Sequence, residues 1–214
     1  MTVQLTARGA VADPAAVSRL ADEFAARRCV TLPAVIDAPL LARIHTTLDA
    51  ATFAERAHGE IATELCMAKN ACLGMLHWLV NDPVVFAFVE RVTGIRGLRS
   101  FSGRVYRRLP GAHHDSWHSD VHPDRAVGMS INLSRDRYEG GVFEIRDERS
   151  GVVQGAIANV GFGDAILFQI AHGLEHRVTS VTGRAPKTAF AGWFGGTRDY
   201  LAMFRQDRFL REEA

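Results

Sequence analysis

Two hydrophobic periodicities divide the chain near residue 97. Before that point apolar residues recur at helical spacing, and after it they alternate with polar residues in short runs separated by glycine-containing turns. The first pattern predicts helices over 13–28, 37–51 and 84–92, with one strand over 29–32. The second predicts strands over 98–109, 127–133, 142–145, 165–168, 176–181 and 188–194, followed by a helix over 200–211.

Two segments resist this interpretation. Residues 1–12 carry little signal. Residues 53–80 are apolar without a clean period, which fits either a loop over a pocket or a packed segment. The helix starts are better marked, because Asp13-Pro14 and Asn81-Asp82-Pro83 place a capping side chain before a proline in the first turn.

Helices followed by many short strands predict an α+β protein. We expect a jelly-roll or barrel core buttressed on one sheet by the N-terminal helices. No internal repeat or convincing linker divides the chain, so residues 1–214 are expected to form one domain. Within it, 1–96 would be a helical lead-in and support, 97–195 the β core and 196–214 a C-terminal helix.

Composition narrows the choice of partners and compartment. The 214 residues are 47% hydrophobic and 23% charged, with a net charge of +1, so we expect neither nucleic-acid nor membrane binding. No apolar run is long enough to span a bilayer, and no signal pattern opens the chain, which favours a cytoplasmic protein. Cys29, Cys66 and Cys72 lack zinc-type spacing and are expected to be reduced thiols.

The strongest chemical signal is Trp117-His118-Ser119-Asp120. On an extended segment His118 and Asp120 would project from the same face and offer one nitrogen and one oxygen to a metal ion. His176, at the start of a predicted strand, is the best third ligand. Two histidines and one carboxylate with open coordination positions indicate a non-haem Fe(II) oxygenase site.

Several histidines compete for these roles. His113-His114-Asp115 lies just past the Pro110-Gly111 turn, and His122-Pro123-Asp124 lies in a predicted loop, so the middle triplet has the best strand neighbours. His172 competes with His176. Because Gly173 separates the two and a strand pattern follows His176, we favour His176.

These motifs together resemble the 2-oxoglutarate- and Fe(II)-dependent oxygenase superfamily, particularly its small prolyl-hydroxylase-like branch. The resemblance runs from about Tyr106 to Phe194. It is carried by the order and spacing of the following motifs: Tyr-x-x-x-Pro-Gly at 106–111, Trp-His-x-Asp at 117–120, Ser-Ile-Asn-Leu at 130–133, Glu-Gly-Gly at 139–141, Gly-Asp-Ala-Ile-Leu-Phe at 163–168, His-Arg-Val-Thr-x-Val at 176–181 and Gly-Trp-Phe at 192–194. It implies a double-stranded β-helix (jelly-roll or cupin-like) core with iron at its mouth.

The resemblance also implies a cation for the distal carboxylate of 2-oxoglutarate. Family members usually carry it six residues before the tryptophan of the last core strand, and Lys187 stands six before Trp193. An even spacing puts both on one strand face, and a buried dicarboxylate needs a cationic partner. Arg184 is a rival in the preceding turn. Tyr106 is a second candidate partner for the same carboxylate. Ala189 stands where a common family pattern has serine.

The implied enzyme is a dioxygenase that uses Fe(II), 2-oxoglutarate and O2, hydroxylates an unactivated C–H bond, and releases succinate and CO2. Desaturation or ring closure would use the same residues. The substrate could be a small molecule, a carrier-tethered group or a peptide side chain. The alternatives are a cupin-like metal-binding module and a cupin enzyme independent of 2-oxoglutarate. Candidate substrate-pocket residues are Trp117, Arg125, Phe143, Arg146 and Trp193.

Overall fold

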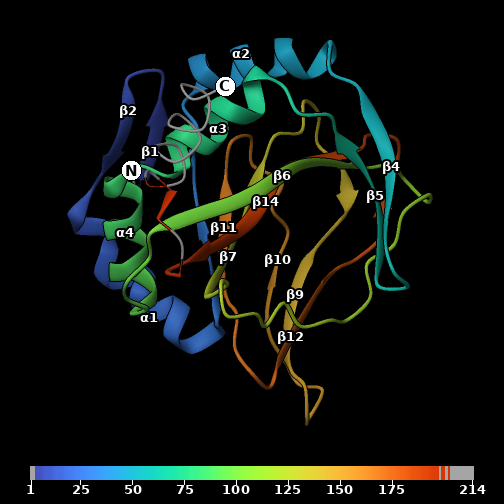
Figure 1. Ribbon diagram of the computed structural model, residues 1–214. Helices are drawn as coiled ribbons and strands as arrows, with labels where there is room; N and C mark the ends of the chain where they lie inside the picture. The colour runs from blue at the N-terminus through green and yellow to red at the C-terminus, as the bar shows by residue number, and fades with distance from the viewer. Residues whose placement is uncertain (1–2, 198, 201, 203–214) are drawn as a thin grey trace, which may run out of the picture.

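The computed structural model describes residues 3–197, 199, 200 and 202, and its core is a pair of antiparallel β-sheets (Figure 1). The larger sheet has seven strands in the order β3 (Cys29–Leu32), β11 (Ala165–Gln169), β7 (Val127–Asn132), β14 (Lys187–Gly195), β6 (Ser100–Arg108), β5 (Ala62–Met67) and β4 (Phe53–His58). The smaller has the order β10 (Val153–Ile157), β9 (Phe143–Asp147) and β12 (Leu174–Val178). Two short pairs, β1 (Val3–Thr6) with β2 (Gly9–Ala12) and β8 (Glu139–Gly140) with β13 (Val181–Thr182), complete the strands.

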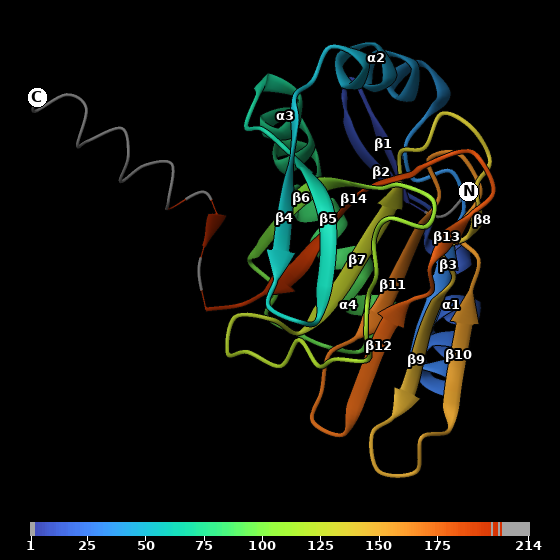
Figure 2. The same cartoon turned by 90° about the vertical axis from the view of Figure 1, so that its right-hand side faces the viewer.

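The two sheets face each other across a small apolar layer. Phe143 and Ile145 of β9 pack against Ile166 and Phe168 of β11, and Figure 2 shows the β9, β10 and β12 sheet standing in front of the longer strands. This arrangement of a large and a small antiparallel sheet is the expected jelly-roll core.

Helices cover the other face of the larger sheet. They are α1 (Val17–Arg27), α2 (Ala38–Asp49), α3 (Ala71–Val80) and α4 (Pro83–Thr93), with a 3-10 turn at Pro14–Ala16. The caps form as predicted, since Asp13 accepts from the Ala15 amide at 3.0 Å and Asp82 accepts from the Val84 amide at 2.8 Å. Gly94 ends α4 with a left-handed φ of 74°.

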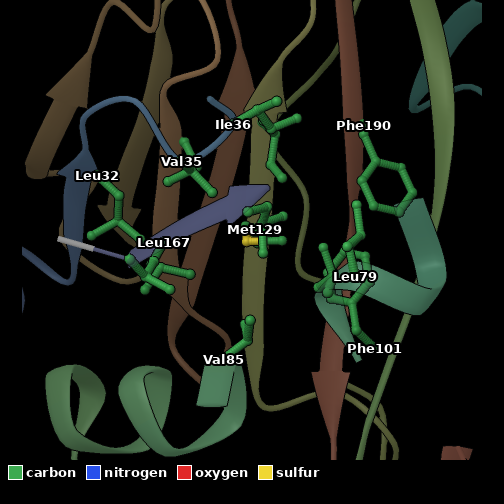
Figure 3. Packing of buried hydrophobic residues seen from close by; sticks show 14 of the residues in the cluster. Leu32, Val35, Ile36, Leu79, Val85, Phe101, Met129, Leu167 and Phe190 are labelled. Atoms are coloured by element: carbon green, nitrogen blue, oxygen red, sulfur yellow. The ribbon is translucent and has the colours of Figure 1, made fainter. Parts of the chain in front are cut away.

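Strand alternation decides which side chains reach the helices and which reach the space between the sheets. Phe190 and Phe194 of β14 join the main hydrophobic core under the helices, as Figure 3 shows for Phe190 beside Leu79 and Phe101. Lys187 and Trp193 of the same strand point the other way and line a cavity between the sheets. One strand thus contributes both to the core and to the cavity.

The structure settles three segments that the sequence left open. Residues 3–12 form β1 and β2, and residues 153–157 form β10. The hydrophobic pattern predicted none of these three strands. Residues 53–80 are a packed segment that forms β4, β5 and α3, and not a loop. The helix predicted over 200–211 lies almost entirely outside the described residues. The division of the chain at 96 and 195 stays a prediction.

No single helix in the described part is long and apolar enough to cross a membrane; α3 and α4 pass that test only together, bent by 56°.

Candidate metal centre

His118, Asp120 and His176 converge at one end of the cavity between the sheets. Their potential ligand atoms all lie within 4.8 Å of one another. The Nε2 atom of His176 lies 3.4 Å from Oδ2 of Asp120, and the two imidazole rings are 4.4 Å apart between centroids. All three side chains are largely shielded from solvent, with 18%, 15% and 10% exposure in sequence order.

The backbone around His118 differs from the strand that the sequence indicated. His118 and Asp120 lie in the long connection between β6 and β7, and only His118 makes a strand-like bridge, with His176 of β12. The His118 amide donates to the His176 carbonyl at 3.1 Å, and the reverse bond measures 2.9 Å. The i, i+2 spacing therefore delivers both ligands from a loop fixed at one point to the smaller sheet.

Asp120 is held in its charged form. Burial raises the pKa of Asp120. The hydrogen bond and charge of His176, together with the 2.6 Å hydrogen bond from Trp193 Nε1, outweigh this effect and lower the pKa to about 2. Arg125 Nη1 donates to the other carboxylate oxygen at 3.0 Å. Two imidazoles beside an ionised carboxylate are a donor set that suits Fe(II).

The rival histidines lie elsewhere. His113 is buried and its Nδ1 accepts from the Leu109 amide at 2.9 Å. His114, His122 and His172 are exposed, and none joins the convergent group among the described residues.

Asp115 of the first rival triplet supports the ligands. Its side chain is 4% exposed, and its Oδ2 accepts from Arg108 Nη1 at 2.9 Å and from the Val178 amide at 3.0 Å. Its Oδ1 lies 3.4 Å from Nδ1 of His118. That imidazole nitrogen is also 2.8 Å from the Ser116 carbonyl. Such contacts orient a ligand ring so that Nε2 faces the metal.

Lys187 lies deeper in the same cavity, with 1% exposure. Its Nζ donates to the Gly141 carbonyl at 2.7 Å. Gly141 has a φ of +59°, and a Cβ there would lie 3.1 Å from Cδ of Lys187, so glycine leaves room for the lysine. Burial, and next the charge of Arg108, lower the pKa of Lys187 to about 7. Arg184 is exposed and is not among the cavity residues.

The polar atoms around Lys187 fit a dicarboxylate. Tyr106 lines the cavity beside it, and its pKa is raised by burial. Arg108 Nε and Ser130 Oγ, both on cavity residues, are buried without a hydrogen-bond partner among the described residues. Buried donors without acceptors are costly, and a carboxylate beside Lys187 would supply an acceptor to Arg108, which pairs with Lys187 across β6 and β14.

Three of the five expected substrate-pocket residues line the cavity, namely Arg125, Phe143 and Trp193. The other two do not. Trp117 instead lies between two guanidinium groups, with the Arg146 carbon 4.2 Å and the Arg177 carbon 4.5 Å from its ring. These arginines belong to β9 and β12, where they also pair with Glu175 and Glu144. Trp117 and Arg146 thus connect the ligand loop to the smaller sheet.

Sequence reasoning missed Arg104, Arg108 and their partners. Arg104 lines the cavity and forms a two-point ion pair with Glu64, whose side chain is fully buried. Burial raises the pKa of Glu64, but the hydrogen bond and charge of Arg104 outweigh it and lower that pKa. The available signal was the spacing of Arg104, Tyr106 and Arg108, which share one face of a predicted strand.

Comparison with known proteins agrees with this geometry. Residues 104–195 match the family model of the 2OG-Fe(II) oxygenase superfamily. This segment contains the convergent triad and Lys187, and it is similar to this superfamily of Fe(II)- and 2-oxoglutarate-dependent oxygenases. No curated protein is significantly similar in sequence.

Solved structures show the same fold at low sequence identity. An oxidoreductase of the 2OG-Fe(II) oxygenase family from Burkholderia pseudomallei is 19% identical with a TM-score of 0.69, over 92% of this chain and 98% of that one. A Pseudomonas putida prolyl-4-hydroxylase is 15% identical with a TM-score of 0.63, over 85% and 100%. HygX from Streptomyces hygroscopicus, solved with nickel, 2-oxoglutarate and hygromycin B, is 14% identical with a TM-score of 0.61, over 84% and 87%.

Proposed function

We propose that this enzyme hydroxylates an unactivated C–H bond, with O2 and 2-oxoglutarate consumed and succinate and CO2 released. The observation that carries the proposal is the meeting of His118, Asp120 and His176 with the buried Lys187 in one cavity. A binding module without turnover has no need for a buried cation beside its metal ligands. This favours the oxygenase over a cupin-like module.

Each residue has a defined task in this proposal. His118, Asp120 and His176 would hold Fe(II), and Lys187 would bind the distal carboxylate of 2-oxoglutarate, with Tyr106 beside it. Bound together, metal and keto acid supply the oxidation, in which one oxygen atom enters the substrate and the other enters succinate. The Ser116 carbonyl, 2.8 Å from Nδ1, keeps the His118 ring oriented. Phe143 and Phe168 pack against the His176 ring, with centroids 5.8 and 4.7 Å away, and exclude water from that side.

The cavity favours a small substrate. Its volume is about 340 Å³, which lies near the lower end of the range for ligand pockets, and 2-oxoglutarate would occupy part of it. A small molecule, or the end of a carrier-bound or peptidyl group, fits the remainder. HygX was solved with a small molecule, hygromycin B, and the prolyl-4-hydroxylase neighbour is named for a prolyl substrate. We propose a cytoplasmic location on composition alone.

Succinate formation tests the proposal. The purified chain with Fe(II), ascorbate and 2-oxoglutarate under air should release succinate, and His176→Ala should abolish this release. Lys187→Ala should raise the 2-oxoglutarate KM by about 30-fold or more, since it removes one partner of a buried charge pair. No succinate from the wild type would favour the binding module. Oxidation of a substrate that is unaffected by Lys187→Ala would favour an enzyme independent of 2-oxoglutarate.

A further inference from the structure

Arg125 is placed to contact whatever molecule lies beside the metal. It lines the cavity, donates one nitrogen to the ligand Asp120, and keeps 32% of its side chain exposed. Its guanidinium carbon lies 3.7 Å from the centroid of the Trp193 ring. Stacking of this kind holds the guanidinium flat and leaves its edge free to donate.

The backbone fixes this position on both sides. The Arg125 amide donates to the His122 carbonyl at 3.0 Å, and the next amide, of Ala126, donates to the Phe194 carbonyl of β14 at 2.8 Å. An arginine held by backbone bonds, a ring stack and an ion pair loses little conformational entropy when a ligand binds. Among the described residues, the acceptor that bonds its guanidinium is Oδ1 of Asp120, so most of its five donors are available.

The net charge of the cavity indicates the charge of the substrate that it binds. Apart from His58, His118 and His176, its lining carries four cations, Arg104, Arg108, Arg125 and Lys187, against Asp115 and Asp120, and Glu64 neutralises Arg104. Asp115 pairs with Arg108. The Fe(II) ion and the 2-oxoglutarate dianion cancel, and the charge of Asp120 offsets one of the two cations Lys187 and Arg125. One positive charge remains in the cavity, where Arg125 keeps unused donors and 32% side-chain exposure.

We propose that the substrate carries a single carboxylate, which Arg125 binds by a two-point hydrogen bond above the Trp193 ring. A planar carboxylate matches the guanidinium edge, and one negative charge completes the neutrality of a partly buried site. Because Arg125 also contacts a metal ligand, the oxidised carbon lies close to the acid group. This inference rests on the proposed function and names its substrate class.

A matched compound panel tests the inference. Small monocarboxylic acids without an amino group are each paired with their primary amide and with a phosphate monoester of similar size where one exists. The assay measures succinate release above the substrate-free rate. We expect at least one acid to stimulate release and its amide to be about 30-fold or more poorer in kcat/KM.

The variant Arg125→Gln then distinguishes loss of carboxylate recognition from damage to the fold or the metal site. It should reduce the acid-to-amide ratio of kcat/KM by about 30-fold, whereas Arg125→Lys should retain part of it. Damage to the fold or the metal site would lower kcat/KM for the acid and the amide alike and leave their ratio unchanged. Arg146→Gln is the matched control, because Arg146 also stacks on a tryptophan but lies outside the cavity; its ratio should equal the wild-type value.

A binding measurement gives an independent readout. With Ni(II) in place of iron, equilibrium dialysis of the best acid in the presence of 2-oxoglutarate should give a Kd that Arg125→Gln weakens by a similar factor. The inference is overturned if amides or phosphate monoesters are preferred, if no acid stimulates release above the basal rate, or if the ratio survives in Arg125→Gln. Absence of any Fe(II)-dependent succinate would instead refute the proposed function.

Discussion

His118 and His176 are joined through their backbones as well as through a shared site. Each amide donates to the carbonyl of the other residue, at 3.1 and 2.9 Å. Such a pair brings two side chains close together on the same side, and here the rings come within 4.4 Å. The proposed metal ligands from the β6–β7 connection and from β12 are therefore positioned without a bound ion.

The two candidate distal histidines should differ sharply in metal binding. His176→Ala should weaken Fe(II) or Ni(II) binding by at least about 100-fold, because it removes a ligand and not only an orienting group. His172→Ala, at an exposed turn, should leave the metal Kd within about twofold. Titration calorimetry under nitrogen measures both. Equal losses in the two variants would contradict the assignment.

The affinity for 2-oxoglutarate should fall as pH rises. Burial lowers the pKa of Lys187 to about 7 in the empty cavity, where Arg108 opposes and Asp115 favours its charged form. Above that pH the lysine is neutral and must regain a proton when the diacid binds, so the Kd should increase by up to about tenfold per pH unit.

Measurement of the 2-oxoglutarate Kd from pH 6 to 9 with Ni(II)-loaded enzyme tests this linkage. Lys187→Arg should flatten the profile, since a guanidinium stays charged throughout. Arg184→Gln should keep the wild-type profile. A flat profile in the wild type would show that Lys187 is not the anchor.

Removal of the Asp115 charge should destabilise the fold. Asp115→Asn leaves Arg108 buried without its carboxylate, at a cost of about 3–5 kcal/mol in the free energy of unfolding. Urea denaturation measures the loss. The double variant with Arg108→Gln should be less destabilised than the sum of the single variants, by roughly 1 kcal/mol or more. Additive effects would mean that the pair contributes no coupling.

The stack on Trp117 should stabilise the ligand loop. Trp117→Ala removes contacts with Arg146 and Arg177, and it should lower the free energy of unfolding by about 1–3 kcal/mol. Because the next residue is His118, metal affinity should also decrease, by about tenfold. Trp117→Phe should restore part of both. If Trp117→Ala lowered stability but left metal affinity unchanged, Trp117 would contribute to packing only and not to the position of His118.

Local patterns were sufficient for much of this molecule. Helices that begin at an aspartate before proline, and strands such as β7 that alternate between core and cavity, follow from spacing alone. The i, i+2 spacing of His118 and Asp120 also indicated the metal ligands, although the segment is a loop, because a single bridge to His176 gives it an extended shape.

Contacts between residues far apart in the sequence could not be predicted from local patterns. Arg104 meets Glu64 only because β5 lies beside β6, and β5 itself lacks a clear period. Trp117 and Arg146 were expected in the pocket as an aromatic and a cation. They pair with each other instead, and their sequence separation gave no sign of it. In the sequence Asp115 is a rival ligand. Its contacts with Arg108 and the Val178 amide form only in the folded chain and could not be predicted from spacing.

A single strand, β14, contributes a side chain to each end of the cavity. Lys187 and Trp193 of β14 stand six residues apart, which corresponds to about 20 Å of extended chain, and Trp193 Nε1 donates to the Asp120 carboxylate, a proposed metal ligand, at 2.6 Å. Insertion or deletion of one residue between them would turn one of the two side chains into the helical layer. The length of β14 between Lys187 and Trp193 is therefore expected to be fixed, because a change of one residue would remove one of these side chains from the cavity.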